Sequence, residues 1–163
     1  GLQGGPLMHV IAAKAAAFKE ALSDEFKEYS RQTLLNAKAI CSSLKDNNFE
    51  VVSGETSCHM LLIDLSNKEV TGKLAEKALD DAGITCNKNS IPFDKQSPFV
   101  TSGIRIGTAA GTTRGFKEEQ FKYIGSLINE VIDSLKKSDD EILKTAELVR
   151  SKVLYLCNKY PLY

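Results

Sequence analysis

Residues 101–116 read Thr-Ser-Gly-Ile-Arg-Ile-Gly-Thr-Ala-Ala-Gly-Thr-Thr-Arg-Gly-Phe, and they begin with the strand on which the fold depends. Side chains alternate between the two faces of an extended chain. Ile104 and Ile106 therefore share a face that can be buried, while Arg105 points to the opposite face. This pattern predicts a strand that joins a hydrophobic core to a polar site.

Two glycines, Gly103 and Gly107, flank Arg105 on its own face of this strand. Glycine weakens a strand interior, and it is often kept where a ligand or another backbone comes close. A guanidinium with open space around it suits a carboxylate, which it can bind through two parallel hydrogen bonds. An ordinary ion pair at the edge of a sheet is the alternative for Arg105.

The composition narrows the class of protein. The 163 residues allow one compact core, or a small domain with an added helix. Lys+Arg and Asp+Glu both number 21, so no net charge favours nucleic acid or an anionic membrane as a partner. No apolar run is long enough to span a bilayer and no leader pattern starts the chain, so we expect a soluble intracellular protein.

The cysteines and histidines are too scattered for a metal site or a disulfide framework. The sequence contains no Cys-x-x-Cys pair and only two histidines, His9 and His59, for which polar surface roles are the simplest interpretation. We expect no metal, and we expect the four cysteines to be small buried side chains. They are Cys41, Cys58, Cys86 and Cys157.

A long helical pattern precedes the arginine strand. Apolar or small residues recur at steps of three and four from Leu7 to Leu44, which predicts a buried helix face. One straight helix of this length does not suit a small domain, so we expect a break at Ser23 and Asp24, both good N-cap residues. The two helices would then cover different parts of the protein.

The remaining patterns predict a small central sheet among helices. Further strands are expected at 49–52, 59–65 and 84–87. Helices are expected from Thr71 to Gly83 with Leu74, Ala78 and Leu79 buried, at 121–135, and from Ser138, which forms a capping box with Glu141, to a point before Pro161. The last helix should be buried through Ile142, Ala146, Val149, Val153 and Leu156.

Two segments outside these elements contain candidate site residues. Residues 87–103 form a polar loop with Pro92 and Pro98, and long loops of this kind are either functional or disordered. Gly4 and Gly5 precede the first helix, where backbone N–H groups and the helix dipole favour a phosphate. A simple entry turn is the alternative for this pair of glycines.

Four motifs, in this order and at this spacing, resemble serine hydroxymethyltransferase (glycine hydroxymethyltransferase). They are Gln-Gly-Gly-Pro-Leu-Met-His at 3–9, Asn-Lys-Asn-Ser-Ile-Pro at 87–92, Ser-Pro-Phe-Val-Thr-Ser-Gly-Ile-Arg-Ile-Gly-Thr at 97–108 and Thr-Arg-Gly-Phe at 113–116. The resemblance is to the C-terminal portion of that family's subunit only. The family's threonine-rich stretch, with the lysine that forms the Schiff base, has no counterpart here.

The resemblance implies a fold and a division of the chain. It implies the small C-terminal domain of a fold-type-I pyridoxal phosphate enzyme, an α/β fold of the α+β type. A small, mostly antiparallel sheet of three to four strands would be covered by helices. Residues 1–23 would end the large domain and include the first helix, and residues 24–163 would form the small domain.

The resemblance also implies an activity, which is transfer of the hydroxymethyl carbon of serine to tetrahydrofolate in one-carbon metabolism and glycine biosynthesis. Pyridoxal 5'-phosphate is the implied cofactor, and a cytoplasmic homodimer is the implied assembly. By likeness, Arg105 binds the carboxylate of serine or glycine, and Gly5 with Gly4 reaches the cofactor phosphate of the neighbouring subunit. Likeness also gives the folate candidates, which are Asn89, Ser97, Pro98 and Phe99.

Some points remain open at this stage. The resemblance assigns no catalytic residue to these 163 residues, so we expect them to be inactive alone. Ala109 stands where the family commonly has proline and Glu55 where it commonly has glycine, which puts the local backbone shape in doubt. For Arg114 we expect a structural salt bridge or a helix-entry role. A stand-alone regulatory module that binds an amino acid through Arg105 without a cofactor is the alternative function.

Overall fold

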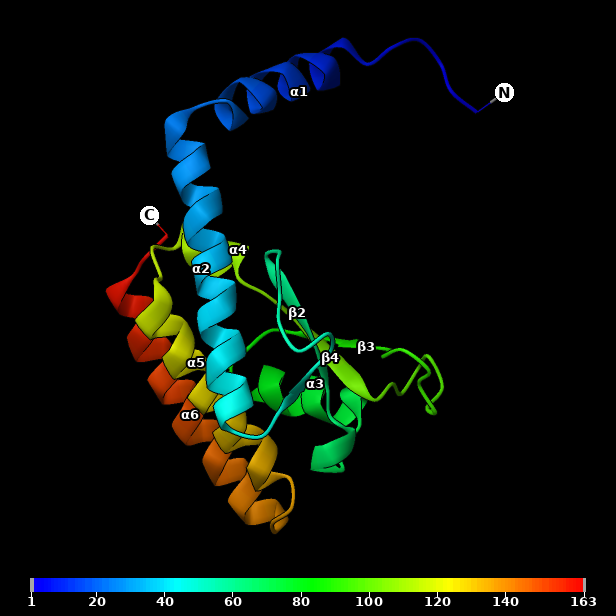
Figure 1. Ribbon diagram of the computed structural model, residues 1–163, viewed down its shortest axis with the longest axis vertical. Helices are drawn as coiled ribbons and strands as arrows, with labels where there is room; N and C mark the ends of the chain where they lie inside the picture. The colour runs from blue at the N-terminus through cyan, green and yellow to red at the C-terminus, as the bar shows by residue number, and fades with distance from the viewer. Residues whose placement is uncertain (1, 163) are drawn as a thin grey trace.

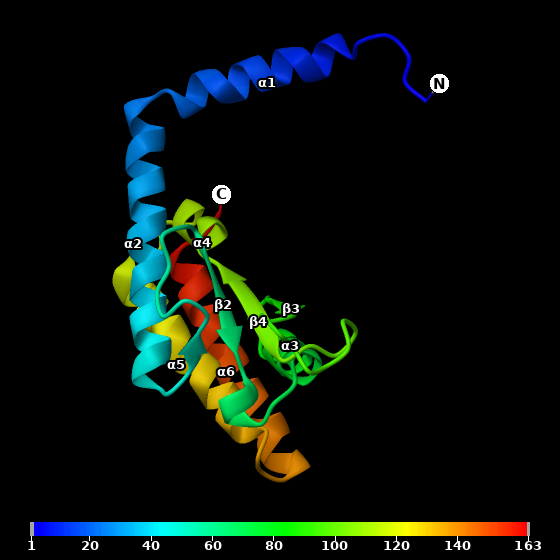
Figure 2. The same cartoon turned by 45° about the vertical axis from the view of Figure 1, so that its right-hand side comes forward.

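The computed structural model describes residues 2–162, and it has the α/β fold with a small antiparallel sheet that the sequence predicts. Helices α2 (Asp24–Asp46) and α3 (Gly72–Asp81) contact the strands, and α5 (Glu118–Ser134) packs across both helices (Figure 1). Helix α6 (Asp139–Lys159) packs on α3 and α5. The helices lie on one face of the sheet, and the other face is left without a helical cover in the described part of the chain (Figure 2).

The arginine strand is at the centre of the sheet. The strand order is β1-β2-β4-β3, and all three pairs are antiparallel. The strands are β1 (Glu50–Val51), β2 (Met60–Asp64), β3 (Asn87–Asn89) and β4 (Gly103–Gly107). Because β4 pairs with a strand on each side, its two faces are fixed. Ile104 and Ile106 are buried towards the helices and Arg105 is exposed on the other face, as predicted.

The third predicted strand is displaced towards the C-terminus. The sequence predicts residues 84–87, but β3 covers Asn87–Asn89, so the polar loop expected from residue 87 begins as a strand. The reason lies at the end of α3. Gly83 adopts a positive φ of 81°, and the next backbone N–H, that of Ile84, donates to the carbonyl of Leu79 at 2.8 Å. The chain is therefore still bonded to the helix and joins the sheet only three residues later.

The core consists of the inward side chains of β2 and β4 together with the apolar stripes of the helices. The largest fully buried side chains are Ile40, Leu44, Leu61, Ile63, Leu65, Leu79, Ile104, Leu127, Ile128, Val131, Ile132 and Val149. Thr71 caps α3 as predicted, because its side chain accepts a hydrogen bond from the backbone N–H of Leu74. Two short elements that the patterns did not predict, η1 (Ser66–Lys68) and α4 (Ala109–Thr113), complete the fold.

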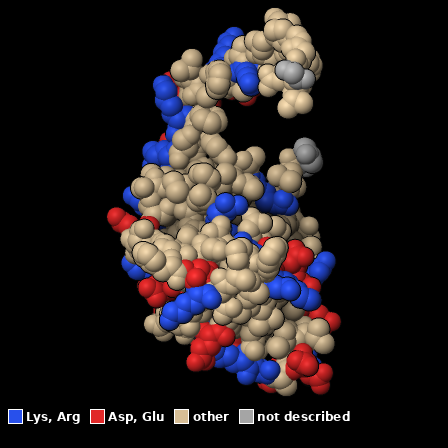
Figure 3. Space-filling view, turned by 90° about the vertical axis from the view of Figure 1, so that its right-hand side faces the viewer, with Lys and Arg blue, Asp and Glu red and all other residues tan. Residues whose placement is uncertain are grey.

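Helix α1 (Met8–Ala21) departs from the predicted burial. The break at Ser23 is confirmed, since its side chain accepts a hydrogen bond from the N–H of Phe26 and starts α2. The prediction of a continuous buried face is wrong before residue 33, however. None of the residues of α1 is buried, and Phe18 is 68 % exposed. The helix projects beyond the sheet and stands clear of the body of the molecule (Figure 3).

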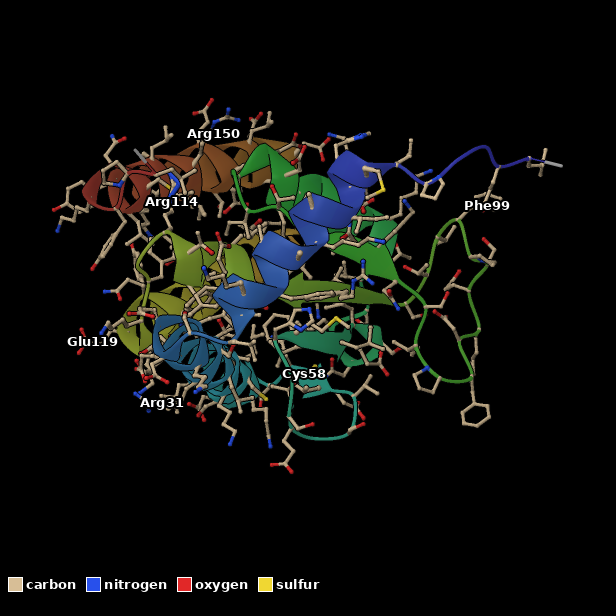
Figure 4. The ribbon with its side chains drawn as sticks, turned by 90° about the horizontal axis from the view of Figure 1, so that it is seen from above. Arg31, Cys58, Phe99, Arg114, Glu119 and Arg150 are labelled. Carbon is tan, nitrogen blue, oxygen red and sulfur yellow. The ribbon has the colours of Figure 1, made fainter. Side chains whose placement is uncertain are left out.

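Four smaller predictions are also corrected. Leu74 is 46 % exposed, and Ala75 is the buried residue in that turn of α3. Cys58 is exposed and Cys157 is only partly buried, because the former lies in a turn and the latter near the end of the outermost helix (Figure 4). Ser138 starts α6, but its hydroxyl donates to the carboxylate of Glu141 at 3.0 Å and does not cap the backbone. On the buried face of α6, Ile142, Ala146 and Val153 are only partly covered.

Charged side chains of both signs lie on the face of the molecule that Figure 3 shows, with lysines and arginines interspersed among acidic side chains. Between residues 2 and 162, no helix combines the length and apolar character that crossing a bilayer requires.

A substitution in the central strand tests the packing. A Cβ added at Gly103 would lie 2.6 Å from the carbonyl oxygen of Ile63 and 3.0 Å from that of Asn89, both of them backbone atoms. We therefore expect Gly103→Ala to lower the free energy of unfolding by about 1–3 kcal/mol, measured by urea titration.

Gly107→Ala is the matched control on the same strand and face. The nearest atom to its added Cβ would be the carbonyl oxygen of His59 at 3.8 Å, which is ordinary contact. Equal losses of stability in the two variants would show that the close approach at Gly103 is not what requires glycine there.

Candidate functional site

Arg105 lies on the uncovered face of the sheet, at the middle of the central strand. Its direct neighbours across the sheet are Leu62 on β2 and Asn87 on β3. Residues directly opposite each other on paired strands share a face, so all three side chains lie on the uncovered side. The guanidinium is exposed there, while the rest of the strand is anchored in the core.

The two glycines beside Arg105 differ in what surrounds them. Gly103 is buried, with the side chain of Ile91 and the neighbouring backbones filling the space that a side chain would need. Gly107 is exposed and has open space above it. The prediction that both glycines clear room for a ligand is therefore wrong for Gly103, where glycine serves close packing. Room beside Arg105 exists on the Gly107 side only.

No carboxylate pairs with Arg105 among the described residues, so the predicted alternative of an edge ion pair is not what the structure contains. The strand is also central and not an edge. One guanidinium nitrogen, Nη2, donates a long hydrogen bond of 3.5 Å to the side-chain oxygen of Asn87. This acceptor is neutral, so the positive charge of Arg105 is left uncompensated and available to an anion.

Arg105 lines a surface pocket of about 400 Å³. Besides Arg105, Asn87 and Gly107, its lining comprises His59, Met60, Thr85 and Cys86. The sequence patterns did not assign His59 or Cys86 to this place, because the pairing of β2 and of β3 with β4 brings together residues that are far apart in the sequence. Burial raises the pKa of the Cys86 thiol to about 12, so this cysteine stays protonated and is not a nucleophile at neutral pH.

The loop that follows β3 is organised around one carboxylate. Asp94 accepts hydrogen bonds from the backbone N–H groups of Ile91 (3.2 Å), Gln96 (2.9 Å) and Ser102 (2.9 Å), and from the Ser102 hydroxyl (2.6 Å). The bond from the Ser102 hydroxyl, followed by the backbone bonds, lowers the pKa of Asp94 to about 2. These four bonds join the two ends of the loop, so its backbone has a defined path without regular structure.

The folate candidates lie on this loop or beside it. Asn89 ends β3 opposite Gly103, two residues from Asn87 and on the same sheet face. Ser97, Pro98 and Phe99 are exposed in a turn closed by hydrogen bonds from the N–H groups of residues 100 and 101 to the carbonyl of Ser97. Phe99 is 83 % exposed and lies on the loop that projects beyond the strands (Figure 4). The structure thus brings Asn89 near Arg105 and leaves the other three candidates further out along the loop.

The cofactor candidates Gly4 and Gly5 precede α1, and the N-terminal end of this helix lies apart from the sheet (Figure 1). Both are exposed, and nothing in the described chain lies within 4 Å of a Cβ built on either. The chain itself therefore does not bring them into the pocket of Arg105.

Three other residues that the sequence singled out lie outside the pocket of Arg105: Ala109, Glu55 and Arg114. Ala109 begins α4, and the positive φ angles of the turn after β1 fall on Ser53 and Gly54, so Glu55 is accommodated without strain. Arg114 makes no ion pair among the described residues, and its buried Nε has no hydrogen-bond partner, so the expected salt bridge is not present. Across residues 2–162, no three His, Cys, Asp or Glu side chains gather as a metal site would require.

The role of Asp94 can be tested through amide exchange. A carboxylate with a depressed folded-state pKa stabilises the structure above its unfolded pKa of 3.8, and the effect is lost as the pH falls towards 2. We expect the amides of Ile91, Gln96 and Ser102 to keep their protection down to about pH 4 and to lose it below.

At neutral pH, Asp94→Ala should expose the same three amides to exchange several-fold faster, measured by NMR. Asp46→Ala, at an exposed position at the end of α2, is the control and should leave them unchanged. Unaltered exchange in Asp94→Ala would mean that the loop is held by other contacts.

Comparison with known proteins identifies the family. A model of serine hydroxymethyltransferase matches residues 1–128. The chain is 58 % identical over 164 residues to the serine hydroxymethyltransferase of Novosphingobium aromaticivorans and 56 % identical over 165 residues to that of Bartonella henselae. It is 54 % identical over 164 residues to that of Erythrobacter litoralis.

Each of these three matches covers 100 % of this chain and 38 % of the relative, so the chain spans well under half the length of the proteins it resembles. This share agrees with a resemblance to one portion of the family's subunit. Since the matched region includes the central sheet, Arg105 and the loop after β3, the chain belongs to the serine hydroxymethyltransferase family.

Proposed function

We propose that this chain supplies the substrate-carboxylate arginine and part of the folate site to a pyridoxal phosphate-dependent serine hydroxymethyltransferase. The reaction converts serine and tetrahydrofolate into glycine and 5,10-methylenetetrahydrofolate. The observation that carries the proposal is the guanidinium of Arg105, which has no carboxylate partner in the described chain and lines a pocket on the uncovered face of the sheet.

Arg105 suits an amino-acid carboxylate by its chemistry. The guanidinium has five N–H donors in a planar arrangement, and among residues 2–162 a single hydrogen bond, to a neutral oxygen, engages it. A carboxylate can therefore be bound through two parallel hydrogen bonds. Two-point binding fixes the orientation of the amino acid, and with it the orientation of the bonds at its Cα, which is what positioning contributes to catalysis.

The N-terminal segment fits a phosphate-binding role, although not within this chain alone. Gly4 and Gly5 are exposed, and α1 has Leu7 as its N-cap, with no side-chain cap and no acidic residue in the first turn. Free N–H groups at the positive end of a helix favour an anion. When bound, pyridoxal phosphate supplies the electron sink for chemistry at Cα. Gly4 and Gly5 would contact its phosphate from a neighbouring subunit of a homodimer.

The division of the chain supports the same proposal. We assign residues 1–23 to the large domain and residues 24–163 to the small domain of the full-length enzyme. The uncovered apolar side of α1, with Ile11 and Phe18 exposed, supports this division because such a face needs a cover from outside these residues. The resemblance assigns the Schiff-base lysine to the large domain, so we expect these 163 residues to be inactive alone. We expect the assembled enzyme to be cytoplasmic.

The loop after β3 would contribute the folate contacts. Phe99 offers a fully accessible aromatic ring, and Asn89 offers an amide on the same face as Arg105. An apolar surface with a few placed polar groups is typical of small-molecule sites. Ser97 and Pro98 precede Phe99 in the same exposed turn and would add contacts beside it.

The carboxylate role of Arg105 is tested in the full-length enzyme with Arg105→Lys. An ammonium group cannot reproduce two-pronged binding, so we expect kcat/KM for serine to fall on the order of a hundred-fold. Affinity for pyridoxal phosphate should be retained.

Arg150→Lys is the control, because Arg150 is an exposed arginine of α6 whose one hydrogen bond goes to the carbonyl of Asp81. Its kinetics should match those of the parent. If Arg105→Lys lost the cofactor and kept normal affinity for serine, the assignment would be wrong.

The folate role of the loop is tested by separating two activities. We expect Phe99→Ala and Asn89→Ala to slow the tetrahydrofolate-dependent cleavage of serine by about ten-fold or more, and to leave the folate-independent cleavage of a bulkier 3-hydroxy amino acid within about two-fold. Phe93→Ala is the control, because Phe93 lies on the same loop and is even more exposed than Phe99. Parallel loss of both activities would indicate that the two residues support the fold and not a folate site.

A further inference from the structure

One side chain directs the guanidinium of Arg105. Asn87 begins β3 exactly opposite Arg105, and both side chains lie on the uncovered face of the sheet. Its side-chain oxygen accepts the hydrogen bond from Nη2 at 3.5 Å. Within residues 2–162 this is the side-chain contact that the guanidinium makes, and both residues line the same pocket.

The strand that carries Asn87 is itself anchored. The next residue, Lys88, points to the helical side, where its backbone N–H donates to Glu76 at 2.9 Å and its ammonium group lies 3.1 Å from the same carboxylate. The bond from this N–H, together with the bond from the ammonium group, lowers the pKa of Glu76, so the carboxylate stays ionised at neutral pH. An edge strand of three residues is thus fixed to α3, and Asn87 has a defined position beside Arg105.

The neutrality of the acceptor matters as much as its position. An aspartate at residue 87 would have the same shape and would pair with the guanidinium as an anion. That internal ion pair would compete with any carboxylate that arrives from solution. An asparagine oxygen takes up one N–H and leaves both the net charge and the remaining donors of Arg105 for a ligand.

We propose that Asn87 is a positioning residue for Arg105: its side-chain oxygen orients the guanidinium towards the pocket and, because it is uncharged, reserves the charge for the carboxylate of the amino acid. This inference rests on the proposed role of Arg105. It adds that the preference of the site for a carboxylate depends on an amide at residue 87.

The test compares two ligands that differ only in the group that Arg105 recognises. Dissociation constants for glycine and for glycinamide are measured by calorimetry on the full-length enzyme loaded with its cofactor. Asn87→Asp should raise the dissociation constant of glycine by about ten-fold or more. The dissociation constant of glycinamide should stay within about two-fold of the parent value. Asn87→Ala should raise the dissociation constant of glycine by a smaller factor, because the guanidinium of Arg105 loses its orientation but no competing charge is added.

Asn158→Asp, an exposed position in α6, controls for the added charge and should change neither constant. The inference is overturned if Asn87→Asp binds glycine as tightly as the parent does. It is also overturned if the substitution raises the dissociation constants of glycine and glycinamide equally, which a structural defect would cause. Arg105→Lys, measured in the same way, distinguishes a failure of the role of Asn87 from a failure of the role of Arg105. If that variant also bound glycine normally, the carboxylate role of Arg105 would fail, whereas a defect in Arg105→Lys alone would overturn only the role of Asn87.

Discussion

The pairing of β4 with strands on both sides is the constraint on which the rest of the structure depends. It fixes which face of the strand each side chain occupies, and a shift of register by one residue would exchange the two faces. Ile104 and Ile106 are then committed to the core, where α2, α3 and α5 complete the packing. The same geometry places Arg105 on the opposite face. The alternation of side chains along β4 therefore produces both the packed core and the candidate site.

Much of this arrangement could be predicted from local sequence signals. Periods of three and four residues identified the helices, and the side chains of Ser23 and Thr71 form the caps that their identity predicts. The helix and cap signals are reliable because each depends on residues a few positions apart, and local bonding decides the outcome. The fold class came from a different source, the resemblance of four motifs to a known family.

The features that could not be predicted depend on contacts between distant residues. Ile84 is bonded to the end of α3, which delays β3, and Gly103 is enclosed by Ile63, Asn89 and Ile91, which no pattern within its own strand could indicate. Asp94 looked like one polar residue among several in a loop, yet it joins both ends of that loop. The exposure of α1 is a related case, because periodicity shows that a face is apolar and does not show what covers it.

The one-sided cover of the sheet has a consequence for the strength of the anion site. Two opposite charges 4 Å apart attract each other by about 1 kcal/mol in water and by about 4 kcal/mol at an effective dielectric constant near 20. With its guanidinium exposed, Arg105 is in the first situation. If another part of the protein covered this face, the effective dielectric constant around the guanidinium would fall, and its attraction for an anion would strengthen without any new contact. The strength of this anion site therefore depends on the cover of the sheet as well as on Arg105 itself.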